Sequence, residues 1–188
     1  MNAKYTKIFN TAVNLFITGG IKKTTMDELA SAANVSKVTI YKYFGDKDAL
    51  YHKVGKQLLD ECQAELTAHL DTEMDISAKI TAVLDTLTAF IISGKLTLTK
   101  QLVKFSDALK TDFDAFNGAY KSAVLQLIRD GKGASLINAD IDDEHLYYYI
   151  DMGLNYFENN KAYRDRVISD ETFKQDFMRF LLNNIFID

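Results

Sequence analysis

The chain has 188 residues, a formal net charge of −4, a single cysteine and no proline, and 47% of its residues are hydrophobic. This length accommodates one or two helical domains that bury roughly 70% of the unfolded surface, and no apolar run approaches the roughly 18 residues of a membrane span. The lone Cys62 excludes an internal disulfide and argues against a zinc cluster, so we expect neither a metal nor another cofactor. Because strands are not indicated and the N-terminus lacks the hydrophobic block of a signal peptide, we expect an all-α, cytoplasmic protein without membrane association.

The charge is unevenly distributed along the chain. Residues 1–56 carry nine lysines and four acidic residues, a net charge of +5, whereas residues 57–188 have a net charge of −9. The attraction of a protein surface to phosphate depends on local charge rather than on the total. The division therefore favours a basic, nucleic-acid-binding head on an acidic body.

The first predicted helix covers residues 4–18. Ile8, Ala12, Leu15 and Phe16 fall on one apolar stripe at helical spacing, and the two glycines that follow end the helix. The lysines on and just after this helix either lie near a DNA backbone or are solvated surface residues, and the sequence does not separate these two interpretations.

Residues 24–47 specify two short helices joined by a tight turn. Thr25 and Glu28 form a capping box, because the threonine oxygen accepts from the N–H three residues on and the glutamate reaches back. A helix therefore begins directly after the threonine. Asn34 tolerates the left-handed conformation that a tight turn needs, and Ser36 is a favourable N-cap for the second helix. This pattern predicts a helix-turn-helix.

The second of these helices is expected to bury Ile40 and Phe44 and to expose the residues of its first two turns. A recognition helix enters the major groove by its N-terminal end, where free N–H groups favour phosphate. There Lys37 could donate to guanine, and Val38 and the methyl group of Thr39 could contact a thymine methyl. Neighbouring tyrosine hydroxyls could bind phosphates, which fixes the register. The alternative is an ordinary surface helix with solvated lysines.

A long helix is predicted over residues 47–70, capped by Asp46, and it bridges the head and the body. Gly55 in its interior costs up to ~1 kcal/mol relative to alanine, which is tolerated where a neighbouring helix passes closely or a bend is needed. The lone histidines of this helix are interpreted as surface or packing residues, because no third ligand stands at metal-binding spacing.

An ordered set of residues runs through the first part of the chain: Ile8, Ala12, Leu15, Phe16, Gly20, Thr24, Thr25, Leu29, Ala30, Val35, Ser36, Thr39, Ile40, Tyr41, Tyr43, Phe44, Lys47 and Leu50. This set resembles the N-terminal signature of the tetracycline-repressor (TetR) family. It departs from that signature at Asn34, where glycine is usual, and at Val38, where a smaller residue or proline is common. The resemblance implies a dimeric transcription regulator, usually a repressor, whose three-helix head binds a palindromic operator and whose helical body binds a small effector.

The resemblance and the exposed helix face together define the predicted DNA contacts. These residues are Thr24, Thr25, Ser36, Lys37, Val38, Thr39, Tyr41, Lys42, Tyr43 and Lys47. We expect a helix-turn-helix DNA-binding domain over residues 1–48 and an effector-binding and dimerisation domain over residues 49–188.

Three amphipathic helices are predicted in the body, over residues 76–93, 96–109 and 113–129. They could surround an effector cavity, although large aromatic side chains fill a core as readily as they line a pocket. The candidate ligand-binding residues, some of them from the helix that follows, are Phe90, Phe105, Phe116, Tyr120, Tyr149 and Tyr156.

The last two predicted helices, over residues 142–158 and 171–186, are apolar over more than the ~100° stripe that a surface helix needs, so they must be covered on two sides. We infer a second subunit packed through a four-helix bundle; the alternative is that both helices are buried within one subunit. The predicted dimerisation residues are Tyr148, Met152, Phe177, Phe180, Leu181 and Ile185.

The predicted architecture is thus a three-helix head and a helical body, with about nine helices counted over the ranges above. The expected function is ligand-responsive regulation of transcription, most often repression, with double-stranded DNA, a second copy of the chain and a small, largely apolar effector as partners. One alternative is a dimeric helical interaction protein that does not bind DNA. The other is an enzyme, against which the scattered histidines and the lack of a nucleophile setting, a phosphate-binding glycine loop or a metal cluster argue.

Overall fold

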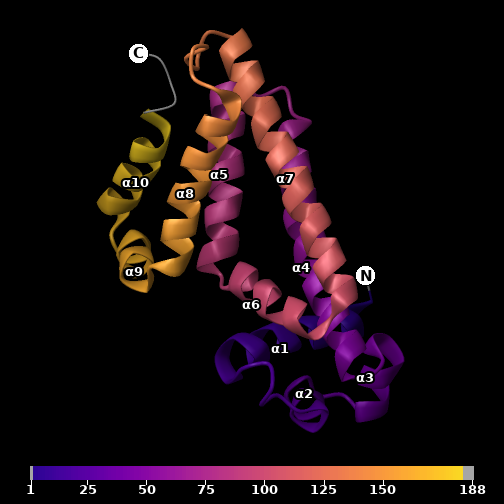
Figure 1. Ribbon diagram of the computed structural model, residues 1–188. Coiled ribbons are helices and arrows are strands. Elements are labelled where there is room, and N and C mark those ends of the chain that lie inside the picture. The colour runs from indigo at the N-terminus through magenta and orange to yellow at the C-terminus, as the bar shows by residue number, and fades with distance from the viewer. Residues whose placement is uncertain (1, 184–188) are drawn as a thin grey trace. The chain divides into compact units, whose positions relative to one another are not determined.

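The computed structural model describes residues 2–183, and describes side chains for residues 2–180. The prediction of an all-α protein is confirmed, since no strand occurs in the described residues. About nine helices were expected, and the described residues contain ten α-helices and one short 3-10 helix (Figure 1). In chain order they are α1 (Ala3–Gly19), α2 (Met26–Ala32), α3 (Lys37–Phe44), α4 (Lys47–Leu70), α5 (Ile76–Ile92), α6 (Lys95–Leu102), η1 (Val103–Phe105), α7 (Asp107–Gly133), α8 (Asp143–Asn159), α9 (Lys161–Ser169) and α10 (Glu171–Asn183).

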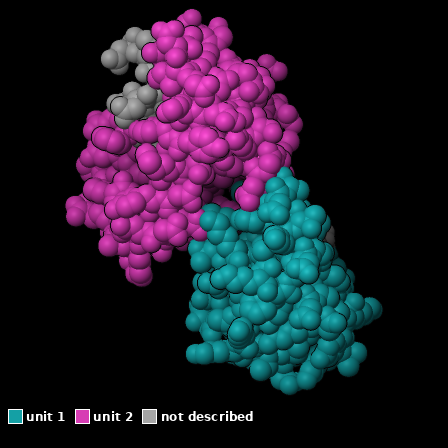
Figure 2. Space-filling view, viewed as in Figure 1, with its two compact units in different colours: residues 1–62, 93–116 teal, residues 63–92, 117–188 magenta. Residues whose placement is uncertain are grey.

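The chain divides into two compact units (Figure 2). Unit 1 comprises Met1–Cys62 and Ser93–Phe116, and unit 2 comprises Gln63–Ile92 and Asn117–Asp188. Helices α4 and α7 each contribute residues to both units. The predicted boundary after residue 48 separates a DNA-binding domain from an effector-binding and dimerisation domain. The division into compact units does not test these roles, so this boundary stays a prediction.

The core of unit 1 forms where α1, α2 and α3 meet. Ile8 and Ala12 on α1, Leu29 on α2, and Ile40 and Phe44 on α3 are all completely buried. Burying a large aliphatic or aromatic side chain contributes about 1.5–3 kcal/mol. The apolar stripe of α1 and the inward face of α3 therefore lie where their helical spacing predicted them.

The core of unit 2 is formed by α5, the second half of α7, α8 and α10. Ile128 and Ile137 are almost fully buried, and Phe157 on α8 stacks on Phe177 of α10 with ring centroids 5.0 Å apart. Aromatic pairs of this kind contribute about 0.5–1.5 kcal/mol beyond their buried area. This pairing joins the last helices of the chain into the same core.

The segment between residues 95 and 133 is divided differently from the prediction. The helix expected over residues 96–109 ends at Leu102 and gives way to η1, and α7 begins at Asp107 rather than near residue 113. Ser106 causes the break, because its backbone is extended and its hydroxyl accepts from the N–H of Leu109 at 3.1 Å. A serine N-cap inside an apolar pattern leaves the helical period almost unchanged, which is why periodicity missed it.

Helix α7 also continues past residue 129, where the predicted helix ended, and this extension includes two glycines. Gly131 is helical and buried, and a Cβ at this position would lie 2.6 Å from the Cδ1 atom of Ile137. The glycine therefore permits the close approach of the following loop rather than ending the helix.

Helix α9 was not predicted. Asn160 caps it by accepting from the N–H of Tyr163 at 3.0 Å, and the Tyr163 ring contacts the rings of Phe173 and Phe177. Of its nine residues, Val167 is the buried one, so the helix carries too weak an apolar pattern to be recognised from sequence.

Across residues 2–183, no single helix is both long and apolar enough for a membrane span. The segments Ile76–Ile92 and Lys95–Phe105 meet the length and composition criteria only when they are taken together across a bend.

A glycine substitution tests the packing of unit 1. A Cβ at Gly55 of α4 would lie 2.3 Å from the Cδ2 atom of Leu109, which is completely buried. We expect Gly55→Ala to lower the free energy of unfolding by about 1–3 kcal/mol through overpacking. Gly118→Ala is the matched control, because Gly118 is helical with open space around it, and this change should stabilise by up to ~1 kcal/mol. Equal denaturation midpoints for the two variants would contradict the close α4–α7 contact.

Candidate nucleic-acid interface

The turn between α2 and α3 has the predicted geometry. Thr25 Oγ1 accepts from the N–H of Glu28 at 3.1 Å, and the glutamate accepts from the N–H of Thr25 at 3.4 Å, which completes the capping box. Asn34 is left-handed with φ of 49°, and the next N–H, of Val35, donates to the carbonyl of Ala30 at 3.0 Å. These local bonds set the direction in which α3 leaves α2.

Ser36 caps α3 as predicted. Its hydroxyl accepts from the N–H of Thr39 at 3.1 Å, and the two hydroxyl oxygens are 2.8 Å apart. Because Ile40 and Phe44 are completely buried, the rotation of α3 about its axis is fixed. The remaining free N–H groups of its first turn give this end a partial positive charge.

The exposed surface of α3 carries four of the predicted DNA contacts. Lys37, Val38, Tyr41 and Lys42 are exposed, and the valine side chain retains 77% of its accessible surface. An apolar side chain this exposed on a two-turn helix lowers stability slightly in water, but it gives a partner surface an apolar contact. The structure therefore brings these residues together on the surface of one helix.

Three further predicted contacts are half-buried beside α3. The hydroxyl group of Thr39 is hydrogen-bonded to that of the N-cap residue, Ser36. Tyr43 packs edge-on against Tyr5 with ring centroids 6.2 Å apart, and Lys47 Nζ donates to the carbonyl of Lys22 at 3.5 Å. These interactions hold the side chains at the rim of the exposed surface and leave each of them partly accessible.

Thr24 does not reach the exposed surface. Its side chain is buried, and its hydroxyl donates to the carbonyl of Gly20 at 3.1 Å. Thr25 and Ser36 are exposed, but their hydroxyl oxygens already accept backbone bonds as helix caps. The structure therefore assigns all three a role in positioning the two helices, and direct DNA contact by them stays a prediction.

Lys37 has a specific partner on the preceding helix. Its Nζ lies 2.9 Å from Oδ1 and 3.0 Å from Oδ2 of Asp27. The hydrogen bond to this carboxylate raises the pKa of Lys37 above its usual value. No pattern along the sequence pairs these residues, because a separation of ten positions across a turn gives no periodic signal.

Tyr51 on α4 was also missed by sequence analysis. It is buried, its hydroxyl donates to the carbonyl of Ile21 at 3.4 Å, and its ring lies between Phe16 and Phe105 with centroids 5.7 Å and 5.3 Å away. It therefore attaches the loop before α2 to α4. A tyrosine four residues after Lys47 fits both a core and a surface position, so the sequence alone did not single it out.

The six candidate ligand-binding residues are not gathered into one site. Phe105 packs on Tyr51 in unit 1, while Phe90 and Phe116 are buried in separate units. Tyr149 donates to the carbonyl of Phe180 at 3.1 Å, and Tyr156 accepts from Asn160 at 2.8 Å on the surface. Tyr120 lines an apolar cavity within unit 2.

That cavity lies between α5, α7 and α8 and has about 20 Å³ of free space. Such a volume accommodates about one water molecule, so a larger ligand has to displace side chains. Its walls are aliphatic apart from one tyrosine: Ile80, Val83, Leu84, Tyr120, Val124, Leu127, Ile128, Ile137 and Ile150.

The predicted dimerisation residues divide into two groups. Tyr148 and Met152 on α8 and Phe180 on α10 are exposed, with 56%, 64% and 73% of their surface accessible. Phe177 is buried against Phe157 and is unavailable to a partner, because α9 places α10 back against α8. The remaining two, the side chain of Leu181 and all of Ile185, lie outside the described residues.

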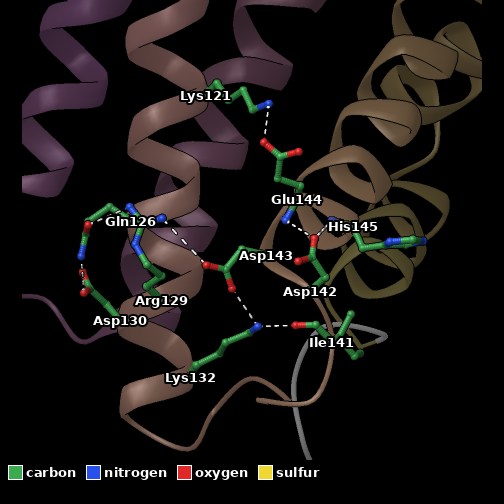
Figure 3. A network of polar contacts seen from close by, with 10 residues as sticks. All are labelled: Lys121, Gln126, Arg129, Asp130, Lys132, Ile141, Asp142, Asp143, Glu144 and His145. Carbon is green, nitrogen blue, oxygen red and sulfur yellow. Dashed lines mark hydrogen bonds and ion pairs between the residues drawn. The ribbon is translucent and has the colours of Figure 1, made fainter.

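A network of ion pairs fixes the start of α8 against α7 (Figure 3). Lys132 lies 2.8 Å from Asp143, Arg129 contacts the same carboxylate at 3.8 Å, and Lys121 lies 3.1 Å from Glu144. These ion pairs join α7 to the first turn of α8. No cluster suited to a metal ion occurs among the residues described. The network therefore positions the exposed stripe of α8.

Comparisons with known proteins agree with this geometry. Residues 8–54, from α1 into α4, match the family described as bacterial regulatory proteins, tetR family. The N-terminal part of the chain is thus similar to the DNA-binding segment of the TetR family of transcriptional regulators. This similarity favours regulation of transcription over the enzyme and non-DNA-binding alternatives.

Two curated relatives and one solved structure give the extent of the similarity. The chain is 30% identical over 91 residues to the uncharacterized HTH-type transcriptional regulator YhgD of Bacillus subtilis, which covers 48% of each protein. It is 27% identical over 156 residues to the regulator RutR of Escherichia coli, covering 80% of this chain and 71% of RutR. A TetR/AcrR-family regulator from Thermobifida fusca has the same fold, with a TM-score of 0.76, 22% identity and coverage of 97% and 98%. The chain thus spans about half the length of YhgD, and the match to the tetR family lies in its N-terminal part.

Proposed function

We propose that this protein is a TetR-family regulator that binds a palindromic DNA operator as a homodimer and represses transcription until a small, largely apolar effector releases it. The observation that carries the proposal is α3 itself. Its apolar face is completely buried at Ile40 and Phe44, and its first two turns present a valine, lysines and a tyrosine to solvent. A helix with this orientation and a free N-terminus fits the major groove.

Each exposed residue of α3 has a role that its chemistry supports. Lys37 donates to guanine O6 and N7, and Val38 contacts a thymine methyl group. Tyr41 and Lys42 bind phosphates, which fixes the register without reading sequence. The +5 charge of residues 1–56 supplies the salt-dependent attraction.

A dimer explains the exposed apolar stripe of α8. Tyr148, Met152 and Tyr156 are four residues apart and retain 56%, 64% and 56% of their accessible surface, so they form one line along the helix. A contiguous apolar surface of this kind marks an interaction site. Two copies joined through α8 and α10 present two recognition helices, which bind only if their separation matches successive major grooves, about 34 to 36 Å apart.

The aliphatic cavity of unit 2 supports an apolar effector. Tyr120 is its one polar side chain, so the ligand that fits is a compact hydrocarbon with at most one hydrogen-bonding group on that side. Helix α7 lines the cavity and also supplies residues to unit 1, which contains the recognition helix. A ligand that displaces α7 therefore also moves residues of unit 1. A thousandfold loss of operator affinity requires the ligand to prefer the DNA-incompetent state by roughly 4 kcal/mol.

DNA binding is tested with a duplex selected by the protein from a random library. We expect Lys42→Ala to weaken binding to all duplexes and to reduce the slope of log K against log salt by about 1, because one phosphate contact is lost. Lys161→Ala on α9 removes the same charge from unit 2 and should leave affinity unchanged. Failure to select any duplex, measured by fluorescence anisotropy, would overturn the proposed function.

The dimer is tested by placing a charge in the α8 stripe. Met152→Glu should shift the protein to monomers at micromolar concentration in sedimentation equilibrium, because a carboxylate would be buried without a partner. Met74→Glu is the matched control, since Met74 is also exposed but lies before α5. An unchanged dimer in Met152→Glu, or a monomeric unmodified protein, would exclude this interface.

The effector site is tested by filling the cavity. Compounds that raise the thermal midpoint of the protein should also weaken operator binding, and operator should weaken their binding by the same factor. In Val124→Ile, whose added methylene group fills the free space without displacing a helix, both effects should be weakened while operator binding persists. Compounds that act undiminished on this variant would place the effector elsewhere.

A further inference from the structure

Lys37 and Asp27 are held together across the helix-turn-helix. Asp27 is the second residue of α2 and Lys37 is the first residue of α3, and the ammonium group bridges both carboxylate oxygens at 2.9 and 3.0 Å. The side chains are 43% and 76% exposed, respectively, so the pair lies on the surface and can open without disturbing the core.

The pairing is unusual among the lysines of the head. In the described residues 2–56, Lys37 and Lys56 are the lysines paired with a carboxylate, and Lys56 pairs with Asp60 one turn further along α4, whereas Lys47 and Lys53 donate to backbone carbonyl groups. The head therefore leaves most of its lysines available to phosphate. It neutralises the lysine that stands at the N-terminal end of the proposed recognition helix.

A physical reason for this arrangement is present in the fold. A cation in the first turn of α3 opposes the positive end of the helix dipole, and the Asp27 carboxylate offsets that repulsion. The same carboxylate repels DNA phosphates and occupies donors of the Lys37 ammonium group. The ion pair thus stabilises the free head, whereas binding of DNA requires Lys37 to leave the carboxylate.

We propose that Asp27 competes with DNA for Lys37 and thereby limits the affinity of the recognition helix. Lys37 leaves the carboxylate when it contacts a base or phosphate. The free energy needed to break the Lys37–Asp27 ion pair is then subtracted from the free energy of DNA binding. This inference rests on the proposed function, because it assumes that α3 meets DNA.

The test compares Asp27→Asn with a variant of equal charge. On the duplex selected by the unmodified protein, Asp27→Asn should bind about two- to fivefold more tightly, the range expected for an exposed ion pair. Asp48→Asn removes one exposed acidic charge from the first turn of α4 and should have a smaller effect. Affinities are measured by fluorescence anisotropy at one fixed salt concentration.

The same substitution is then made where Lys37 is absent. In a Lys37→Ala background, Asp27→Asn should increase affinity no more than Asp48→Asn does, because no ammonium group remains to be released. An equal increase with and without Lys37 would show that Asp27 acts only through its charge. A decrease in Asp27→Asn would show that the carboxylate positions Lys37 for DNA. Either result, or no change, overturns the proposal.

A measurement without DNA separates this proposal from the proposed function. In the free protein, the Lys37 amine should react faster with an acylating reagent in Asp27→Asn than in the unmodified chain, because loss of the hydrogen bond lowers its pKa toward the ordinary value. Lys42 serves as the internal reference. If the unmodified protein binds no duplex, the proposed function fails and this inference fails with it; if it binds and the variants are equal, only this inference fails.

Discussion

The burial of Ile40 and Phe44 is the constraint on which the rest of the head depends. A two-turn helix has little stability of its own in water, so its position is decided by the core against which it packs. Once those two side chains are buried against α1 and α2, the opposite surface of α3 must face solvent. Asn34 fixes the direction of approach and Ser36 fixes the first turn, so the exposed residues are presented in one defined orientation.

Around this core, the polar residues of the head are used for positioning as much as for recognition. The hydroxyl groups of the N-cap residues Thr25 and Ser36 accept hydrogen bonds from backbone N–H groups. Thr24 is buried in the loop before α2. Tyr51 attaches that loop to α4 through the carbonyl of Ile21. A hydroxyl group that is already bonded to the backbone gains less from a phosphate than a free one, so the exposed lysines and tyrosine of α3 remain the principal candidates for DNA contact.

In the body, the candidate effector site is defined by the shape of an apolar cavity rather than by hydrogen-bonding groups. Its cavity is aliphatic apart from one tyrosine and nearly filled, so a ligand bound there must move helices, as the proposed release from DNA requires. The α8 stripe lies on the same unit and is fixed by the ion pairs at the end of α7. The proposed dimer surface and the proposed effector cavity thus share helix α8, which offers a physical basis for coupling between them.

The sequence by itself determined the head. Its capping box, left-handed asparagine and apolar spacing are local signals, and each depends on residues within four or five positions of one another. Only the tertiary structure decided the close packing at Gly131, the burial of Phe177 and the pairing of Lys37 with Asp27. In each of these, the deciding partner is contributed by another element, so no pattern along the chain indicates it. The Ser106 break and helix α9 depend instead on local caps, which the apolar period does not reveal. The cavity also could not be predicted from the sequence. Aliphatic residues that line a cavity and those that fill a core have the same sequence pattern, and only the packing of α5, α7 and α8 distinguishes them.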